Sequence, residues 1–357
     1  MSLRDAITIV IPTYERPAYL ARVNVYYADF DCEVVIYDGS AQPNLMSFAS
    51  NIRYRHVPAL SIGQRFALGS RECKTRYIVP MPDDDLMSQQ GLIECVNYLD
   101  THAEAVSVHG QMICFDTDKN NKVDLRLSTG AAYLQHIERP TSEEPFFSLQ
   151  YALDPYHPFI WGVHRLDPYR AFWKIGMDWI GNLNLWEYFF MWFMAVEGKL
   201  QMLPIFLIAR QRQQLRHGDT HQARQGLDRV LISLAESDHD TAKVITIIAD
   251  KMRQKWEVEF QTAQFFLYGL LVSYVVKNQI GVLRRPMDSL SGRQRLVNRT
   301  LKAIDNLVAR TNPYYVRTVD NWGAVYFTEK RKFPVYEPRY QADLKKMYDV
   351  IARYPAH

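Results

Sequence analysis

Three consecutive carboxylates, Asp83, Asp84 and Asp85, follow the apolar run 77–81. Adjacent carboxylates repel one another, and a cation bound between them removes that repulsion. Hard divalent cations such as Mg²⁺ and Mn²⁺ take oxygen ligands, often one or two protein carboxylates together with a substrate phosphate. The triplet therefore predicts a site for a metal ion and a diphosphate. The alternative is a solvated acidic turn that caps the following helix, because aspartate also favours helix N-termini.

Two more polar turns follow short apolar runs near the start of the chain. The run 7–11 ends at Pro12-Thr13-Tyr14-Glu15, and the run 33–37 ends at Asp38-Gly39-Ser40. Continuous apolar runs of this length are typical of strands buried on both faces of a parallel sheet. In open α/β sheets, ligands bind at the carboxyl ends of the strands. We therefore expect these two turns and the carboxylate triplet to share one crevice.

The elements that would position these turns alternate between strand and helix. Strands are expected at 7–11, 33–37, 52–57, 77–81 and 105–109, and helices at 18–27, 61–74 and 88–99. This alternation predicts an α/β fold with a mostly parallel sheet flanked by helices. Beyond a loop-rich stretch at 116–150, the expected elements are strands at 157–165 and 200–209, a buried helix at 184–198, and helices at 227–236, 239–280 (as one helix or a broken one), 290–311 and 338–354.

The charge distribution suggests two parts. The chain of 357 residues has a formal net charge of +3, but residues 1–215 carry −5 and residues 216–357 carry +8. We expect an α/β catalytic domain over 1–217 and a mainly helical C-terminal region over 218–357. The longest apolar stretch, 265–276, is shorter than the ~20 residues that a membrane span needs.

The three turns and their flanking strands carry a family resemblance. The segments ITIVIPTYERPAYL, VVIYDGS and YIVPMPDDDL occur in that order, and together they resemble the nucleotide-sugar-binding half of a family 2, GT-A-fold glycosyltransferase. The resemblance covers roughly 6–115, with a looser match to about 217. It implies a GT-A-like (Rossmann-related) sheet and a metal-dependent, inverting transfer of a sugar from a nucleotide-diphosphate sugar to an acceptor hydroxyl. UDP is the expected nucleotide, with GDP and dTDP as alternatives.

The resemblance also implies roles for individual residues. Pro12, Thr13, Tyr14 and Glu15 would hold the nucleotide, with Tyr14 beside the uracil ring. Asp38 would accept a hydrogen bond from the uracil N3–H, and Arg65 would approach the diphosphate or the base. Asp83, Asp84 and Asp85 would bind Mn²⁺ or Mg²⁺ together with the diphosphate.

The sequence departs from the family pattern in two places. The family usually shows D-x-D-D at the metal motif, and an ungapped alignment puts Pro82 at the first aspartate. Whether Asp83 and Asp85 or Asp84 and Asp85 form the ligand pair is therefore open. Tyr37 replaces the first of two acidic residues that often follow the second strand.

An inverting transfer needs a base that removes the proton of the attacking hydroxyl. Family members often place an acidic residue at the start of a helix some 100 residues after the metal motif, and Glu187 fits that place. Its aromatic neighbours would desolvate the carboxylate and raise its pKa. Asp178 is the second candidate base and Asp154 the third. The structural alternative is that Glu187 pairs with an arginine or caps its helix.

A basic segment with two histidines follows the strand at 200–209. In the resembling family such a segment can close over the diphosphate, and its histidine can join the metal shell. His217 is the candidate ligand and His221 the alternative, with Arg212 or Arg216 near the phosphates.

Two other functions are considered. A nucleotidyltransferase acting on sugar phosphates would normally carry a glycine- and Lys/Arg-rich loop after the first strand, and the turn at 12–16 lacks those glycines. A non-catalytic nucleotide- or sugar-binding scaffold would bind nucleotide without turnover. No G-x-x-x-x-G-K-[ST] or G-x-G-x-x-G motif occurs, so P-loop and dinucleotide-binding functions lack their phosphate-binding turn.

The segment 277–302 holds seven basic residues against one acid, Asp288. A solvated helix face is one explanation. The other is a surface for an anionic, lipid-linked or polymeric acceptor, with nucleic acid not excluded. A secretory signal and a transmembrane span are not expected, so we predict a cytoplasmic protein, with contact at the membrane surface as an alternative.

Overall fold

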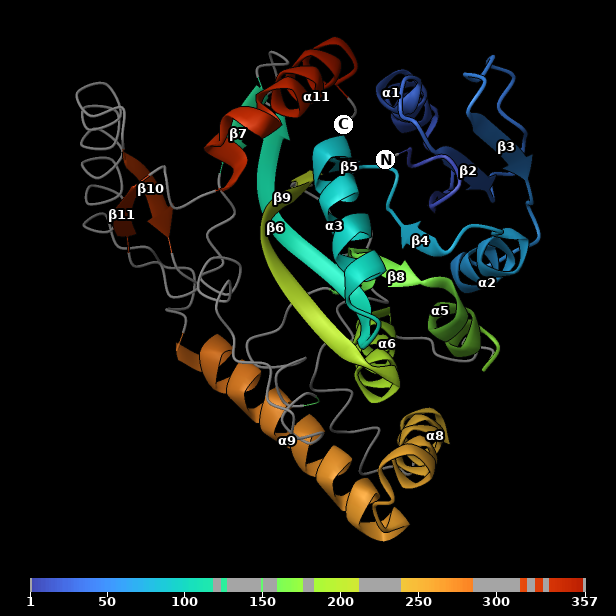
Figure 1. Cartoon of the computed structure of the whole chain (residues 1–357), viewed down its shortest axis with the longest axis vertical. Helices are drawn as coiled ribbons and strands as arrows, with labels where there is room; N and C mark the ends of the chain where they lie inside the picture. The colour runs from blue at the N-terminus through green and yellow to red at the C-terminus, as the bar shows by residue number, and fades with distance from the viewer. Residues whose placement is uncertain are drawn as a thin grey trace.

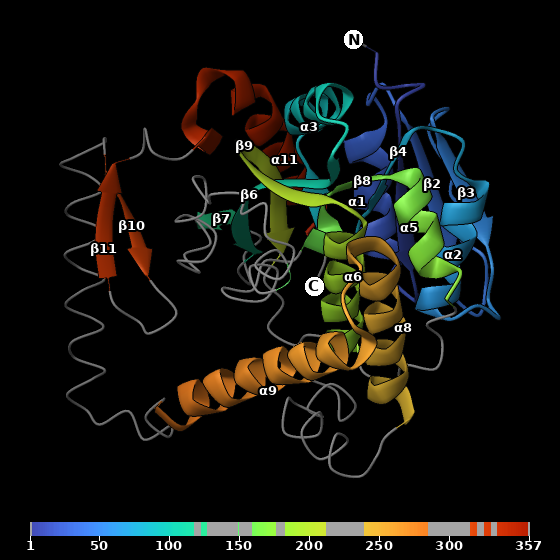
Figure 2. The same cartoon turned by 60° about the horizontal axis from the view of Figure 1, so that its bottom comes forward.

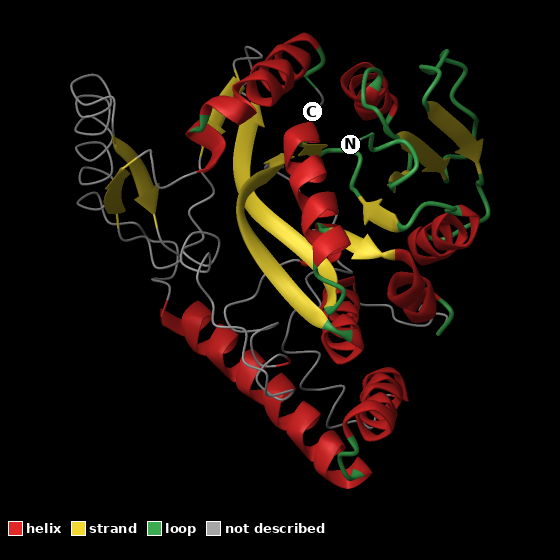
Figure 3. Ribbon diagram, viewed as in Figure 1, coloured by secondary structure: helices red, strands yellow, loops and turns green. Residues whose placement is uncertain are grey.

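The computed structural model is shown in Figure 1, coloured along the chain. Its described residues are 2–117, 123–126, 149, 159–175, 183–211, 239–284, 315–319, 325–329 and 334–355. Within them a curved, mixed nine-stranded sheet lies between helices (Figure 3), with strand order β3-β2-β1-β4-β8-β6-β9-β5 and β7 paired to β6. This confirms the predicted α/β architecture with helices flanking a sheet, but the sheet is mixed rather than mostly parallel.

The first half of the sheet is parallel. Strand β1 (Ile7–Thr13) pairs with β2 (Glu33–Asp38) on one side and with β4 (Tyr77–Pro80) on the other, and β2 pairs with β3 (Ile52–His56). Every residue of β1 and β4 is buried, as their apolar sequences predict. Strands that run in parallel bring their carboxyl ends to one edge, and that edge carries all three polar turns.

The second half of the sheet mixes directions. Strand β8 (Val163–Arg165) is antiparallel to both β4 and β6 (Ala105–Thr117), and β6 is parallel to β9 (Lys199–Gln211). Two shorter strands, β5 (Leu86–Met87) and β7 (Val123–Arg126), add antiparallel pairs to β9 and β6. Through β5, the end of β9 reaches the residues that directly follow the carboxylate triplet.

Three helices follow the parallel strands. Helix α1 (Pro17–Tyr27) starts with a proline, which suits the first turn because its missing N–H has no partner there anyway. Helix α2 (Ile62–Glu72) starts with a capping box in which Ser61 and Gln64 satisfy each other's backbone N–H groups. Helix α3 (Gln89–Thr101) is capped by the Ser88 hydroxyl, which accepts from the Gly91 N–H.

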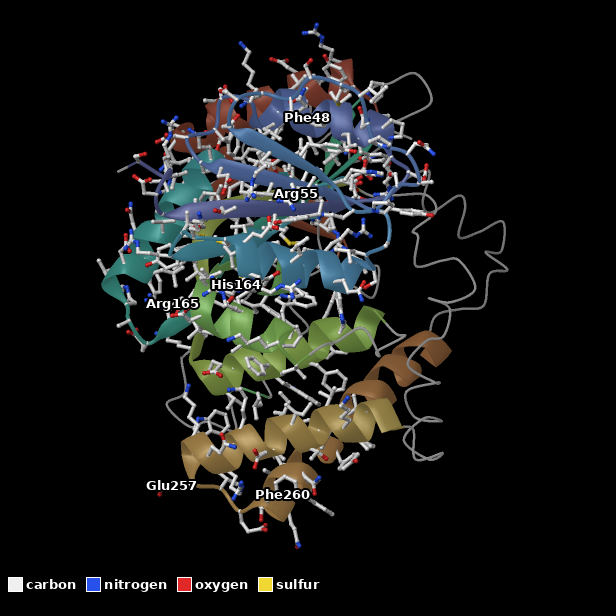
Figure 4. All side chains as sticks on the ribbon, turned by 90° about the vertical axis from the view of Figure 1, so that its right-hand side faces the viewer. Phe48, Arg55, His164, Arg165, Glu257 and Phe260 are labelled. Carbon is white, nitrogen blue, oxygen red and sulfur yellow. The ribbon has the colours of Figure 1, made fainter. Side chains whose placement is uncertain are left out.

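The buried residues form two cores, and one of them is rich in aromatic side chains. It packs α5 (Leu166–Trp173) and α6 (Leu183–Glu197) against the sheet, with α8 (His239–Trp256) and α9 (Phe260–Arg284) beyond them. Helices α6 and α8 lie side by side in Figure 2 and contact each other. Figure 4 shows the order of the layers in space. Arg55 on β3 comes first, His164 and Arg165 on β8 come next, and Glu257 and Phe260, at the turn between α8 and α9, come last.

The C-terminal part returns to the first half of the sheet. Helix α11 (Gln341–Arg353) contacts α1, and the turns before it contact α3 and β9. Val335, Tyr340, Met347 and Ile351 belong to the same buried core as β1 and β2. Strands β10 (Tyr315–Val319) and β11 (Val325–Glu329) pair with each other. The division at residue 217 stays a prediction.

Several expected elements differ in detail. The single strand expected at 157–165 is a 3₁₀ turn, Phe159–Trp161, followed by the short β8. The segment 239–280 is two helices that break at Glu257, whose positive φ of 56° ends regular helix geometry. The helices expected at 227–236 and 290–311 lie outside the described residues. No helix in the described ranges is both long enough and apolar enough to cross a membrane.

Candidate active site

The three polar turns meet at the carboxyl edge of β1, β2 and β4. The Gly39 N–H, after β2, donates to the Thr13 carbonyl at 3.0 Å. The Thr13 hydroxyl, at the end of β1, donates to Oδ2 of Asp83, a residue that follows β4, at 2.6 Å. The structure therefore confirms that these turns share one edge, as the parallel-sheet pattern predicts.

Each carboxylate of the triplet contacts the protein differently. Asp83 is buried and accepts from Thr13 through one oxygen and from Arg16 Nη1, at 2.6 Å, through the other. The same Nη1 lies 3.2 Å from Asp84 Oδ2. Burial, followed by the charge of Asp84, raises the pKa of Asp83, and the Arg16 guanidinium works against that rise.

Asp85 faces the end of β9 instead. The Gln211 N–H donates to Asp85 Oδ1 at 2.9 Å, and Arg210 Nε lies 4.0 Å from Oδ2. Burial, and next the charge of Asp84, raise the pKa of Asp85 to about 8. The triplet is thus split, with Asp83 and Asp84 turned to the β1–α1 loop and Asp85 to β9.

A buried arginine links these two sides. Arg22 on α1 is fully buried, and its Nη2 donates to the Asp84 carbonyl at 2.8 Å and to Gln211 Oε1 at 2.7 Å. Within the described residues its Nε and Nη1 have no hydrogen-bond partner. Burial lowers the pKa of Arg22, whereas the neighbouring Tyr19 and the three aspartates favour its charge. This cation therefore ties α1, the triplet and the end of β9 together.

The predicted nucleotide contacts lie around the turn after β2. Asp38 is buried, and it accepts from the Ser40 N–H at 2.8 Å and from the Tyr54 hydroxyl at 2.7 Å, as well as from the Ser40 hydroxyl. Ser40 in turn accepts from the Glu15 N–H at 2.7 Å, and Glu15 Oε1 accepts from the Ala41 N–H at 2.8 Å. Asp38 thus organises the two loops that border the site.

Arg65 reaches the same edge from α2. Its guanidinium donates to the Thr13 carbonyl through Nη1 and to the Ser61 carbonyl, at 3.3 Å, through Nε. Burial lowers its pKa, and the charges of Asp38 and Asp83 counter that effect. A Cβ atom on Gly39 would lie 2.8 Å from Arg65 Nη1, so any other residue there makes the guanidinium move.

Tyr14 differs from its neighbours in exposure. Pro12 and Thr13 are buried as the last residues of β1, whereas 52% of Tyr14 is exposed. The next residue, Glu15, has a positive φ of 53°, which is uncommon for a residue with a side chain. The exposed ring stands at the rim of the edge, where a planar ligand could stack on it.

Glu187 lies in the first half of α6 and is half-buried beside the buried Trp186 and Tyr188. The remaining predicted site residues, Asp178 and His217, lie outside the described residues, as do Asp154, His221, Arg212 and Arg216. Of the basic segment 277–302, only the backbone of 277–284 is described, as the end of α9.

The donor atoms at the triplet suit a hard divalent cation, because they are carboxylate oxygens. The described part of the chain nevertheless holds no group of three or more Asp, Glu, His or Cys side chains arranged to bind a metal ion. In this structure Arg16 contacts Asp83 and Asp84, and a backbone N–H contacts Asp85. The ligand chemistry therefore fits Mn²⁺ or Mg²⁺, and binding requires these contacts to rearrange.

Sequence reasoning missed Arg16, Arg22 and Gln211. Arg16 belongs to the polar turn at 12–16, but the fold decides which way its side chain points. Arg22 carried a readable signal, because it interrupts the buried face of α1 between Leu20 and Val23. A cation on the apolar face of a helix indicates a buried charge that needs a partner.

Some solved structures are similar to this chain at low identity. The crystal structure of S. aureus TarS 1–349 in complex with UDP-GlcNAc has a TM-score of 0.48 and 14% identity, and covers 92% of this chain and 98% of that chain. The longer S. aureus TarS structure gives 0.45 and 12%, and covers 79% of this chain, which spans only 46% of that one. What TarS binds is a property of TarS. No curated protein matches the chain by sequence.

The family comparison bears directly on the site. The profile of glycosyl transferase family 2 matches residues 8–173. That range contains the edge at which Thr13, Arg65 and the carboxylate triplet meet. The part of the chain that builds this site is therefore similar to glycosyl transferase family 2.

Proposed function

We propose that the protein transfers a sugar from a UDP-sugar to an acceptor hydroxyl, with a divalent cation and with inversion at the anomeric carbon. The observation that carries the proposal is the 2.6 Å contact between Thr13 and Asp83. It joins the turn proposed for the nucleotide to the carboxylates proposed for the diphosphate, inside the range that the family profile matches.

The nucleotide end of the donor is assigned to Pro12, Thr13, Tyr14, Glu15, Asp38 and Arg65. Tyr14 supplies an exposed ring for stacking on the base. Arg65 supplies a cation whose position is set by two carbonyl groups. Both oxygens of Asp38 already accept hydrogen bonds from Ser40 and Tyr54, so the base would share Oδ2 with the Tyr54 hydroxyl or replace it.

The diphosphate end is assigned to the triplet. Asp83, Asp84 and Asp85, with His217, would hold Mn²⁺ or Mg²⁺, which would neutralise charge on the leaving diphosphate. Thr13 orients the Asp83 carboxylate, Arg22 holds the Asp84 carbonyl, and the Gln211 N–H holds the Asp85 carboxylate.

Glu187 is proposed as the base that takes the proton of the acceptor hydroxyl, with Asp178 as the alternative. The support is its position near the start of α6, half-buried among large aromatic side chains. Direct attack by the hydroxyl on the anomeric carbon would give inversion.

The acceptor is proposed to be anionic and to contact the basic segment 277–302, and the enzyme is proposed to work in the cytoplasm or at a membrane surface. The support is the charge of that segment alone. If it holds, transfer to the natural acceptor weakens with added salt, because screening acts on exposed charges beyond about 10 Å at 0.1 M. A salt-independent rate would contradict it.

The donor proposal is tested by thermal unfolding with UDP, GDP and dTDP, each with and without Mn²⁺. We expect UDP to stabilise the protein, and Mn²⁺ to increase the shift. Asp84→Ala should keep the UDP shift and lose the increase with Mn²⁺. If no nucleotide raises the melting temperature in either condition, the proposed function is wrong.

A further inference from the structure

The β1–α1 loop places a cation on the carboxylates that are proposed to bind metal. Arg16 Nη1 lies 2.6 Å from Asp83 Oδ1 and 3.2 Å from Asp84 Oδ2, so a single nitrogen bridges two side chains. Burial alone would lower the pKa of Arg16, but the charges of Asp83 and Asp84 outweigh it and raise the pKa. The guanidinium thus compensates the repulsion between the two carboxylates.

This bridge occupies the place that a metal ion would need. Asp83 has one oxygen bound to the Thr13 hydroxyl and the other bound to Arg16. A divalent cation that joined Asp83 to Asp84 would put a second positive charge at the position of the guanidinium. The arginine and the metal therefore exclude each other at this pair of carboxylates.

The surroundings allow Arg16 to leave. Its side chain is 18% exposed, against 4% for Asp83, so the guanidinium borders solvent while the carboxylate does not. The Tyr19 ring lies under the guanidinium at 4.7 Å and provides a surface along which it can shift without losing every contact. Arg22, by contrast, is fully buried and cannot play this part.

We propose that Arg16 is an exchangeable counter-ion that holds Asp83 and Asp84 until a divalent cation and a nucleoside diphosphate arrive together. The inference rests on the proposed function and adds an order to it. A metal ion alone must displace the guanidinium and leaves it without a partner. A diphosphate offers the planar guanidinium two oxygens in the geometry it prefers, so Arg16 changes from carboxylate to phosphate.

Two consequences follow for binding. Mn²⁺ binds weakly to the nucleotide-free protein, and UDP strengthens its binding. Because coupling between two ligands is reciprocal, Mn²⁺ strengthens UDP binding by the same factor. Removing the guanidinium removes the competitor, so the metal binds without help and the coupling falls.

The test measures Mn²⁺ binding from the electron paramagnetic resonance signal of free Mn²⁺, with and without UDP, and UDP binding by calorimetry. Arg16→Met should bind Mn²⁺ alone at least about tenfold tighter than the unaltered protein, a difference of about 1.4 kcal/mol. The factor by which UDP improves Mn²⁺ binding should shrink to a similar degree. The control is Arg76→Met. Arg76 precedes β4, at the end away from the triplet, and pairs with Asp100, so its loss should change neither the Mn²⁺ affinity nor the effect of UDP on it.

Arg16→Lys is the second variant, in case the methionine variant does not fold. Lysine keeps the charge but lacks the planar fork, so we expect Mn²⁺ affinity near that of the unaltered protein and weaker coupling to UDP. The inference is overturned if UDP binds but Arg16→Met binds Mn²⁺ no tighter than the unaltered protein, or if Mn²⁺ binds to neither. If UDP itself does not bind, with or without Mn²⁺, the proposed function fails instead.

Discussion

The hydroxyl of Thr13 donates to the carboxylate of Asp83 at 2.6 Å, although the two residues are 70 positions apart in the chain. The bond joins the carboxyl ends of β1 and β4, which are neighbours in the sheet. It fixes the direction of the most buried carboxylate of the triplet, and it uses one of the two oxygens of Asp83. The other oxygen is thereby left to a cation.

Thr13→Val should loosen Asp83 and weaken binding of UDP in the presence of Mn²⁺. The variant removes one hydrogen bond to a charged, buried acceptor, which costs about 1.5–3 kcal/mol. Calorimetry with UDP and Mn²⁺, together with urea unfolding, measures both effects. The matched control is Thr8→Val, on the same strand, whose hydroxyl lies 3.0 Å from that of Thr75. It should lower stability without changing affinity, and equal affinity losses in the two variants would contradict the role of Thr13.

The raised pKa of Asp85, about 8 against an ordinary 3.8, predicts a pH-dependent stability. The folded protein holds this proton more tightly than the unfolded chain does. The stabilisation is therefore fully present below pH 3.8 and is lost as the pH rises through 8, with a slope of at most about 1.4 kcal/mol per pH unit. Urea unfolding at several pH values in EDTA measures the slope.

Asp85→Asn should flatten that slope, because the amide does not titrate. Asp5→Asn, at an exposed position, is the control and should leave the slope unchanged. If the stability of Asp85→Asn changed from pH 5 to 8 with the same slope as that of the unaltered protein, the pH dependence would have a source other than Asp85.

Gly39→Ala should weaken UDP binding. The added Cβ would lie 2.8 Å from Arg65 Nη1 and 3.0 Å from its Cζ, so the guanidinium must move from the Thr13 carbonyl. We expect the dissociation constant for UDP to rise about tenfold, as for the loss of one charge-assisted hydrogen bond of about 1.5 kcal/mol. Arg65→Lys should give a loss of similar size, and unchanged affinity in both variants would remove Arg65 from the nucleotide site.

Gly269→Ala should act in the opposite direction, on stability alone. Gly269 is exposed within α9, and nothing described lies within 4 Å of its added Cβ. Alanine in a helix interior is more stable than glycine by about 0.5–1 kcal/mol. Thermal unfolding should show a higher melting temperature with unchanged activity. A lower melting temperature would indicate a contact on this face of α9.

Glu187→Gln should remove transfer while leaving nucleotide binding intact. Loss of a general base typically lowers kcat by about 10²–10⁴-fold. UDP release with acceptor present measures the rate, and calorimetry measures binding. Glu197→Gln is the control on the same helix, because Glu197 pairs with Lys251 and Lys255 of α8. If Glu187→Gln keeps its rate and Asp178→Asn loses it, Asp178 is the base.

The sequence predicted the first half of the sheet well, because its strands are buried on both faces and read as continuous apolar runs. It predicted the end of β1, the end of β2 and the triplet as one site for the same reason. The single-residue contacts were out of reach. Arg16 could have faced solvent or the triplet with the same sequence, and only the loop geometry places it on Asp83.

The second half of the sheet was harder to read. Strand β6 was expected to end at His109 but continues to Thr117. The prediction stopped early because buried polar residues such as Gln111 interrupt the apolar pattern of the strand. Strand β5 has two residues and leaves no periodic signal. It exists because β9 offers it a partner, which no local pattern encodes.

The packing of α11 has a consequence for how the chain folds during synthesis. Ser88, the cap of α3, bonds to Asp343, Glu94 on α3 bonds to Tyr340, and Lys346 pairs with Asp29 after α1. The core around β1 thus includes residues made more than 300 positions later. While the chain grows on the ribosome, the apolar surface under α11 stays uncovered until residues 334–355 emerge. The domain can therefore reach its final stability only after residues 334–355 have been made.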